Sequence, residues 1–435
     1  MKFIAEKKIF FFLSFLLILS YARSPDIFSQ GRFWAEDGSL YFQNALKNSF
    51  IENFFKIYTP TIGYYNLFSR ITALVSSKFA LEISALVNVY LSYSVVIYIF
   101  FLILFNNSYL YNKNIEKFAY CLLVVVCPTF VPEIWVNSVN AQIYLSVAAL
   151  FILYSKNIEN LLFKYLNPII LFIGGFSSVY VFFLTPFFFI KYKFLKNKYN
   201  LINLIILFVS FIFQLIFYVY SKLSGQMIFR NTNIEIDLNY LITFFYNTLA
   251  KLFFPKEVLI SLYSFLLSGS KMLTLSVITI VLILLIYSFN EIRKILKNNN
   301  IQLFITLSLV IILISLILII ILFSGEYIAG RYSSIPGFII CLIIFNLAFQ
   351  KIKSKFFKKY LIFLTLLILI SGFYQYRPHN NYRIQYLDCI KNCVEWKYQV
   401  KSFRNDNKKN KLIVWPYNKE DNLEKFEYQN ILIVN

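Results

Sequence analysis

The sequence predicts an all-helical polytopic membrane protein with about eleven transmembrane helices and a small C-terminal tail of mixed helix and strand. Of its 435 residues, 59% are hydrophobic and only 14% are charged, whereas soluble domains average about 45–50% and about 25%. The mean hydropathy is +0.65. Long apolar runs recur along the chain, with short clusters of Lys and Arg between them. These observations exclude a soluble globular protein.

The first apolar run covers residues 9–21 and follows Lys2, Lys7 and Lys8. It resembles a signal peptide, but no small-residue cleavage pattern follows it, so we expect a retained helix that begins in the cytoplasm. Ten further runs cover residues 79–105, 117–132, 141–155, 163–175, 177–190, 200–220, 271–289, 301–323, 334–350 and 360–376. Eleven spans of about 20 residues would use half of the chain. The two runs that flank Gly174 also fit a re-entrant hairpin.

The basic clusters predict the orientation, because Lys and Arg favour the cytoplasmic side of short loops. Alternate connections carry them: Lys113 and Lys117; Lys156 and Lys164; Lys191, Lys193, Lys196 and Lys198; Arg293, Lys294 and Lys297; Lys351, Lys353, Lys355, Lys358 and Lys359. All five connections lie inside when the N-terminus is inside. We therefore predict a transmembrane domain over 1–376, a first outer loop over 22–78, and an extracytoplasmic tail over 377–435. The net charge of +21 then indicates a bilayer and no nucleic acid as partner.

The first outer loop contains apolar residues at helical spacing, which predicts amphipathic surface helices over 39–57 and 64–77. The loop over 221–270 is expected to form two interfacial pieces, although an extra pair of spans also fits its apolar stretches. In the polar tail, two short strand-like runs cover 411–415 and 430–434. We expect them to form a small subdomain.

Metal and disulfide chemistry has little support in the composition. The single histidine, His379, excludes a multi-histidine metal site, and the five cysteines show no zinc spacing. Cys389 and Cys393 lie four apart in the predicted outer compartment, where a disulfide is permitted.

Two adjacent carboxylates, Glu36 and Asp37, follow the first span within Arg32-Phe33-Trp34-Ala35-Glu36-Asp37-Gly38. A carboxylate at the membrane surface can accept the proton of an attacking hydroxyl, while a phosphate leaving group needs no strong acid. The alternative interpretation is that Asp37 or Ser39 caps the helix that follows. Two carboxylates could also hold a divalent cation such as Mg or Mn.

A second outer segment, Gly325-Glu326-Tyr327-Ile328-Ala329-Gly330-Arg331-Tyr332, precedes the tenth span. The guanidinium of Arg331 suits a phosphate, which it can hold bidentately. The alternative is an ordinary interfacial Arg beside a Tyr of the aromatic belt. Arg70 is a weaker candidate for the same role.

Other polar residues of the outer side are candidates for binding sugar hydroxyls. They are Arg32 and Trp34 in the first loop, Glu133, Asn137, Asn140 and Gln142 between the third and fourth spans, and Glu326 and Tyr332 before the tenth. A polar turn that satisfies helix ends explains the middle group equally well.

Taken together, the motifs resemble bacterial glycosyltransferases of the GT-C superfamily. The likeness is carried by Arg23-Ser24-Pro25-Asp26, Phe33 to Gly38, Asn140-Ala141-Gln142 and Gly330-Arg331-Tyr332, and extends to about residue 376. It implies a sugar donor linked to polyprenyl phosphate, an acidic catalytic motif in the first outer loop, and an active site on the outer face of the bacterial inner membrane. Asp37 or Glu36 would be the catalytic carboxylate and Arg331 would hold the donor phosphate.

We therefore expect an inverting transferase of a hexose or pentose, with a glycan, lipid or protein as acceptor and no certain cofactor. The alternatives are a lipid-linked glycan flippase, which would need ionisable residues within its spans, and a polymerase or ligase of O-antigen type, which would use the 221–270 loop. The position of the acidic pair directly after the first helix favours the transferase.

Overall fold

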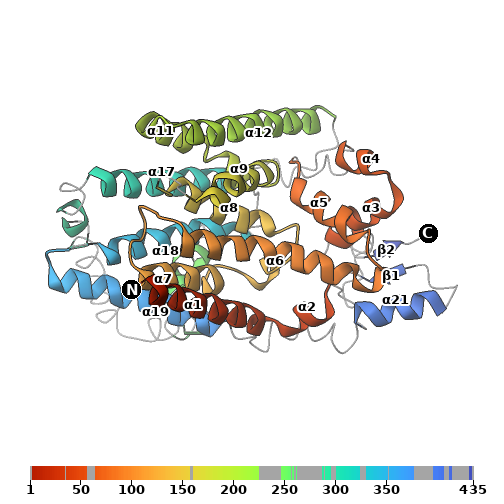
Figure 1. Ribbon diagram of the computed structural model, residues 1–435, viewed down its shortest axis with the longest axis horizontal. Coiled ribbons are helices and arrows are strands. Elements are labelled where there is room, and N and C mark those ends of the chain that lie inside the picture. Colours follow the sequence, from red (N-terminus) through yellow and green to blue (C-terminus); the bar gives the residue numbers. More distant parts are fainter. Residues whose placement is uncertain are drawn as a thin grey trace. The chain divides into compact units, whose positions relative to one another are not determined.

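The computed structural model describes residues 2–34, 36–55, 64–156, 160–224, 246–255, 257–258, 261, 287–288, 290–294, 300–323, 330–350, 352–376, 395–405, 411–413 and 431–433 (Figure 1). Almost all of the expected span over 271–289 and most of the 221–270 loop lie outside these residues. Glu326, His379, Cys389 and Cys393 lie outside them as well. The described chain forms two compact units: one of Met1–Asn106, Pro132–Phe229 and Pro378–Asn435, and one of Asn107–Val131 and Arg230–Arg377.

Several helices are long and apolar enough to cross a membrane, which confirms the helical, membrane-compatible class. Within the described ranges they are α6 (Leu81–Phe105), α12 (Lys198–Leu223), Arg331–Phe349, which includes α18, and α19 (Lys355–Tyr376). A fifth candidate is the pair of α9 (Leu161–Gly175) with the segment Val179–Leu195, bent by 118° at the break. The bend lies after Gly174, where the sequence also fitted a re-entrant hairpin.

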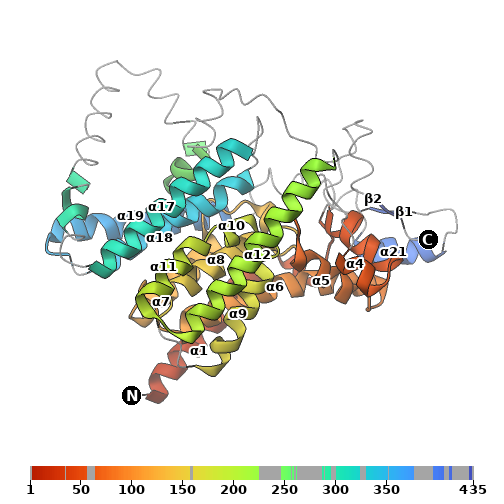
Figure 2. The same ribbon diagram turned by 90° about the horizontal axis from the view of Figure 1, so that it is seen from above.

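The first unit contains the first outer loop and most of the predicted N-terminal spans. Besides α6, α9 and α12, its elements are α1 (Lys2–Arg23), α2 (Pro25–Gln30), η1 (Asp37–Phe42), α3 (Gln43–Lys47), α4 (Phe50–Phe55), α5 (Leu67–Ser76), η2 (Pro132–Ile134), α8 (Ala141–Leu153), α10 (Val179–Phe182), α11 (Thr185–Leu195) and α21 (Trp396–Asn405). In Figure 2, α11 and α12 run side by side, and they pack against each other.

Strands β1 (Lys411–Ile413) and β2 (Ile431–Ile433) complete the first unit. They pair antiparallel, with Leu412 opposite Leu432, and lie within the two strand-like runs of the tail. Helix α21, whose position in the tail the sequence analysis did not give, packs against β1 and α6.

The second unit is built from α7 (Asn114–Val126), η3 (Tyr246–Ala250), α14 (Lys251–Phe253), α17 (Asn300–Phe323), η4 (Gly330–Ser333), α18 (Ser334–Phe349) and α19. Helix α18 packs against both α17 and α19, and α7 packs against α19. The hydroxyl of Ser334 donates to the Thr129 carbonyl at 3.0 Å, and the Thr129 hydroxyl donates back to the Ser334 carbonyl at 3.2 Å. This reciprocal pair ties the start of α18 to the end of the α7 segment.

The prediction of a single surface helix over 39–57 is wrong, because the helical conformation is interrupted at Asn48. Asn48 is extended, and a capping box then starts α4: the Ser49 amide donates to a Glu52 carboxylate oxygen at 2.9 Å, and the Glu52 amide donates to the Ser49 hydroxyl at 3.3 Å. Ser followed three residues later by Glu is a helix-start signal. The periodic apolar pattern ran across this signal, so the boundary was missed.

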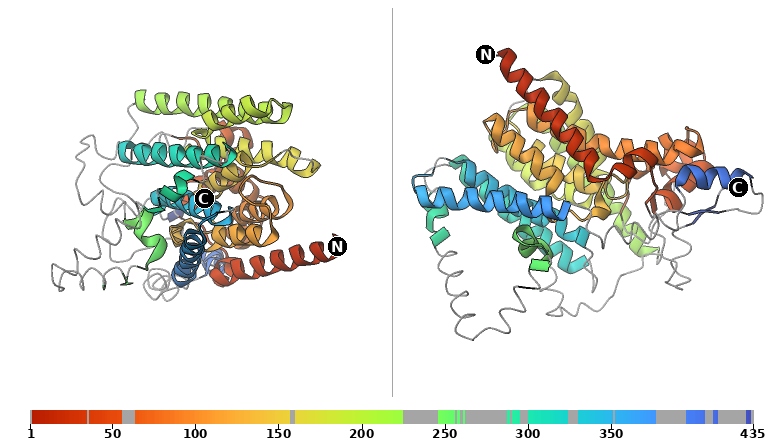
Figure 3. Two further views of the ribbon diagram at one scale, coloured as in Figure 1. Left: turned by 90° about the vertical axis from the view of Figure 1, so that its left-hand side faces the viewer. Right: turned by 90° about the horizontal axis from the view of Figure 1, so that it is seen from below.

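The turn from α2 into the acidic loop depends on Gly31. Helix α2 follows α1 after one residue, as the red ribbon beyond N shows in the right view of Figure 3. Pro25 begins α2, since proline suits the first position of a helix. Gly31 ends α2 with φ of +70°, a conformation that favours glycine. A Cβ atom at Gly31 would stand 2.5 Å from the Leu86 Cα and 2.9 Å from the Ala85 carbonyl carbon. The missing side chain therefore lets the loop lie directly against the α6 backbone.

Replacement of Gly31 by Ala is expected to destabilise the protein by about 2–4 kcal/mol, from the positive φ and the collision with backbone atoms that cannot rotate away. Thermal unfolding of the purified protein in detergent measures the loss. Gly174→Ala is the matched control, because a Cβ there would approach side-chain atoms of Val181, at 3.3 Å, and of Leu145, at 3.6 Å. Equal unfolding temperatures for the two variants would contradict the close approach of Gly31 to α6.

Candidate functional site

The acidic pair that follows the first span occupies two different environments. Asp37 opens η1 and is 1% exposed. One carboxylate oxygen accepts hydrogen bonds from the Ser138 hydroxyl at 2.5 Å and the Val139 amide at 2.8 Å. The other accepts from the Ser138 amide at 3.2 Å and the Asn88 side chain at 3.4 Å. Asp37 therefore joins the first outer loop to α6 and to the 132–140 segment.

The turn that receives Asp37 is held by its own side chains. The amides of Asn137 and Asn140 both donate to the Glu133 carbonyl, at 2.5 and 3.2 Å, and the Asn140 backbone amide donates to the Asn137 side chain at 2.9 Å. Val136 has a φ of +44°, which is strained for a β-branched residue. Such strain persists where the surroundings enforce it and often marks functional sites. These contacts present the backbone amides of the turn to the carboxylate.

The sequence analysis did not single out Asn88, the residue of α6 that contacts Asp37. It lies on a buried polar face of α6, where the Ser84 and Ser92 hydroxyls donate to carbonyls of the helix itself. Ser84, Asn88 and Ser92 are all buried, and a spacing of four residues places them on one face of the helix. In a run as apolar as α6, polar residues at this spacing were the available signal. Ser138 was also missed, although it lies between two residues that were singled out.

Burial governs the ionisation of Asp37. It raises the pKa of this carboxyl to about 6, against hydrogen bonds from Ser138 and Val139 that lower it, and the negative charge of Glu36 raises it further. Arg32 is buried with its guanidinium 4.9 Å from the centre of the Trp34 ring. Burial lowers the pKa of Arg32 to about 9, while the charge of Asp37 opposes that change. Arg32 thus stays protonated at neutral pH, and Asp37 titrates closer to neutral pH than an exposed carboxyl does.

This pKa of Asp37 predicts how stability depends on pH. A carboxyl that titrates near 6 when folded and near 3.9 when unfolded holds more protons in the folded state between those values. Its contribution to stability is therefore complete below about pH 4 and is lost as pH rises through about 6. We expect the unfolding temperature of the wild type, measured relative to Asp37→Asn, to fall across this window. A flat difference would contradict the burial of Asp37.

Glu36 differs from its neighbour because its side chain is partly exposed. It precedes η1 and makes no capping hydrogen bond. Within the described part of the chain, its carboxylate has no hydrogen-bond donor or cationic partner. Of the two carboxylates, Glu36 is the one with oxygen atoms available to another molecule.

Two further candidate residues of the first unit, Arg70 and Gln142, make contacts with other residues of that unit. Arg70 is buried, donates to the Asn53 carbonyl at 2.6 Å and lies over the Tyr65 ring at 4.3 Å. This places it at the end of α4. The Gln142 amide, which is partly exposed, donates to the Tyr64 hydroxyl at 3.4 Å.

Arg331 and Tyr332 belong to the second unit, where η4 precedes α18. The Arg331 guanidinium lies 5.4 Å from the centre of the Tyr332 ring, and both side chains are partly exposed.

No group of three or more His, Cys, Asp or Glu residues that could hold a metal is found among the residues that the structure describes. Both oxygens of Asp37 already accept hydrogen bonds. The acidic pair therefore cannot chelate Mg or Mn through both carboxylates without breaking the contacts to the 138–139 backbone.

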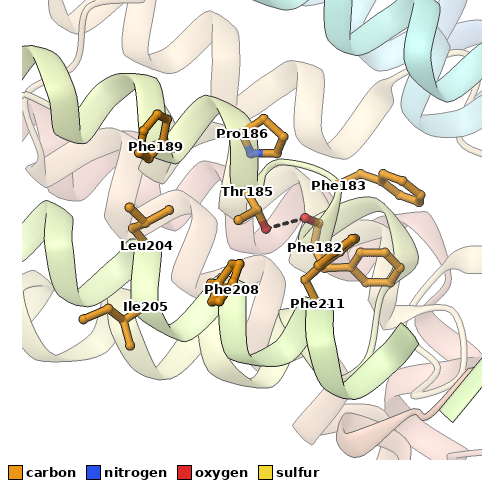
Figure 4. Close-up of a pocket in the computed structure, with 9 residues that line it drawn as sticks. All are labelled: Phe182, Phe183, Thr185, Pro186, Phe189, Leu204, Ile205, Phe208 and Phe211. Carbon is orange, nitrogen blue, oxygen red and sulfur yellow. Dashed lines mark hydrogen bonds between the residues drawn. The ribbon is translucent and has the colours of Figure 1, made fainter. Parts of the chain in front are cut away.

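An apolar groove of about 600 Å³ lies between α12 and the α10–α11 segment (Figure 4). It is lined by Phe182, Phe183, Thr185, Pro186, Phe189, Leu204, Ile205, Phe208 and Phe211. The Thr185 hydroxyl donates to the Phe182 carbonyl, so it adds no free polar group. Ile205 and Phe208 are each about half exposed, which shows that the groove opens at the surface of the unit.

The groove is connected to the acidic site through α5. The Leu67 amide donates to the Phe176 carbonyl at 3.1 Å and the Phe68 amide donates to the Ser177 hydroxyl at 2.8 Å, which joins α5 to the turn before α10. At the same end of α5, the Asn66 amide reaches the Val139 carbonyl at 3.5 Å. Both features thus belong to one packed unit.

Comparisons with known proteins give no relative: no family model, no curated protein and no solved structure matches the chain.

Proposed function

We propose that this chain is an integral membrane glycosyltransferase of the GT-C type, which transfers a sugar from a polyprenyl-phosphate donor to an acceptor hydroxyl at the outer face of a bacterial inner membrane. The observation that carries the proposal is the partly exposed Glu36 beside a buried and fully hydrogen-bonded Asp37. A reactive base must be accessible and held in place. This pair supplies both properties directly after the first helix.

In the proposed reaction Glu36 takes the proton of the acceptor hydroxyl as its oxygen attacks the anomeric carbon. The bond between that carbon and the phosphate oxygen breaks, and the polyprenyl phosphate leaves with the negative charge. Attack opposite the leaving group inverts the anomeric configuration. Asp37 holds the loop in place and does not exchange the proton.

Arg331 is assigned to the donor phosphate, because a guanidinium can hold two phosphate oxygens at once and stabilise the charge of the leaving group. Its partly exposed position before α18 leaves it accessible for this role. Glu133, Gln142 and Tyr332, which are partly exposed, are proposed to line the sugar and acceptor sites, and Glu326 belongs to the same predicted loop as Arg331. Arg32 and Trp34 are buried against each other, so they are assigned to holding the acidic loop. The structure gives Asn137, Asn140 and Arg70 other partners, so we assign these three to building the site.

The lipid chain of the donor is assigned to the apolar groove between α12 and the α10–α11 segment. A polyprenyl chain needs an apolar surface that opens toward lipid, and the exposed Phe208 and Ile205 provide such an opening. The groove also lies in the same unit as the acidic loop. One donor could then have its tail in the groove and its sugar near Glu36.

The proposed topology has eleven spans with the N-terminus in the cytoplasm. The contacts of α21 with α6 and of β2 with η1 support a tail on the same side of the membrane as the first outer loop. A tail on that side is expected if the total number of spans is odd, as in the eleven-span arrangement.

The proposal is tested by mass spectrometry of the surface glycans from a deletion strain. Loss of one sugar, restored by the wild-type gene, supports a transferase. Loss of the whole polymer would instead indicate a flippase or a polymerase, and unchanged glycans would contradict all three functions. Purified protein in liposomes with a polyprenyl-phosphate sugar then tests transfer directly.

A further inference from the structure

The C-terminal helix α21 is packed against the segment that carries the acidic pair. Trp396 is buried, and its ring meets the Phe33 ring edge to face with centres 5.1 Å apart. Phe33 in turn stacks on Phe42 at 4.4 Å. These rings, together with Ala85, Val400 and Leu412, form one apolar cluster.

Polar contacts fix the orientation of α21 within this cluster. The Trp396 indole donates to the Leu81 carbonyl at the start of α6, at 2.7 Å. The Gln30 amide donates to Glu395 at 3.1 Å. Further along the helix, Arg404 pairs with Glu82, with 2.5 Å between nitrogen and oxygen. The helix is therefore attached along its length to α6, and at its start to the end of α2.

We propose that α21 is a positioning element for the acidic loop, with Trp396 as the positioning residue that sets where Glu36 points. This rests on the function proposed above. Phe33 and Phe42 stand on either side of Glu36 and Asp37 in the chain, so the cluster around Trp396 closes the loop from both ends. Asp37 anchors the loop to the 138–139 backbone at a separate point. Two anchors restrict the loop more than one, which is what a base needs to meet the acceptor in a productive geometry.

Trp396→Ala is expected to lower the amount of modified glycan by roughly tenfold to a hundredfold for equal protein in the membrane, since small misplacements of reacting groups have effects of this size. Trp396→Phe keeps a ring against Phe33 and should restore most of the transfer. Tyr398→Ala is the matched control, because Tyr398 lies on the same helix and is 54% exposed. Wild-type glycans from Trp396→Ala at normal abundance would overturn the proposal.

A milder variant keeps the test valid if Trp396→Ala does not accumulate. Arg404 has a side chain that is 57% exposed, so Arg404→Glu should fold while it repels Glu82 and loosens α21. We expect roughly a twofold to fivefold loss of transfer, recovered when Glu82→Arg is added. Equal activity of the single and double variants at wild-type level would count against the proposal.

Cross-linking tests the docking without any transfer assay. In a background without native cysteines, Gln30→Cys with Glu395→Cys should be joined by a short bismaleimide, detected as a linked peptide by mass spectrometry. Ser29→Cys with Glu395→Cys is the control, since Ser29 is exposed on a different side of α2. Equal yields from the two pairs would refute the docking of α21. A failure of the proposed transferase appears separately, as unchanged glycans in the deletion strain.

Discussion

Replacement of Glu36 by Gln is expected to lower sugar transfer by about 100-fold or more, while the protein remains as abundant and as stable as the wild type. The loss follows because an amide cannot accept the acceptor proton, and general-base catalysis contributes about 10²–10⁴-fold. Stability should be unchanged because Glu36 is partly exposed, and within the described residues no hydrogen bond depends on its carboxylate.

The measurement is the glycan profile of the deletion strain that carries each variant, divided by the amount of protein in the membrane. Asp26→Asn serves as the control, because Asp26 is an exposed carboxylate on α2 in the same outer loop. If the Glu36→Gln variant fully restored glycan modification, Glu36 would be excluded as the base. Its negative charge near the start of a helix would then be its only assigned role. Loss from Asp26→Asn as well would indicate a general effect of loop charge.

Replacement of Asp37, unlike that of Glu36, is expected to cause a large loss of stability. Asp37→Ala leaves the buried amides of Ser138 and Val139 without their acceptor, and a buried donor that loses its partner costs about 1–3 kcal/mol. With the Asn88 contact also lost, we expect a destabilisation of roughly 3 kcal/mol or more. Thermal unfolding in detergent and abundance in the membrane both report it.

Asp37→Asn is expected to destabilise as well, which distinguishes it from Glu36→Gln. Each oxygen of Asp37 accepts from one backbone amide, of Val139 or of Ser138. Either orientation of an asparagine therefore turns its NH₂ group toward an N–H donor. If Asp37→Asn were as stable as the wild type and lost transfer alone, Asp37 would be the base and the roles of the two carboxylates would be exchanged.

Local features of the sequence predicted a large part of the fold. Helices formed where long apolar runs had been recognised, as in α6, α12 and α18, because burial of apolar surface in lipid depends mainly on the composition of each segment. The two strand-like runs of the tail also pair, as β1 and β2. The interruption of the helix at Asn48 was missed because the apolar periodicity continues across the capping box that starts α4.

The sequence indicated which segments form the candidate site but not which of their side chains contact one another. The acidic motif and the 132–140 segment were both singled out, yet their residue types could not say that they meet. Asn137 and Asn140 were candidates either for binding a substrate or for forming a polar turn, and their amides donate to the Glu133 carbonyl, as the turn interpretation requires. Polar side chains are equally suited to either task, so only their partners distinguish the two.

By itself, the sequence determined the membrane-compatible helical class, several of its long apolar helices and the place of two adjacent carboxylates after the first helix. Only the tertiary structure decided that Asp37 is buried against Ser138 and Val139, that Glu36 stays accessible, and that Trp396 packs on Phe33. The physical reason is sequence separation. Hydropathy and helix signals act within a few residues, whereas these contacts join residues about a hundred or several hundred positions apart and exist only after the chain has packed.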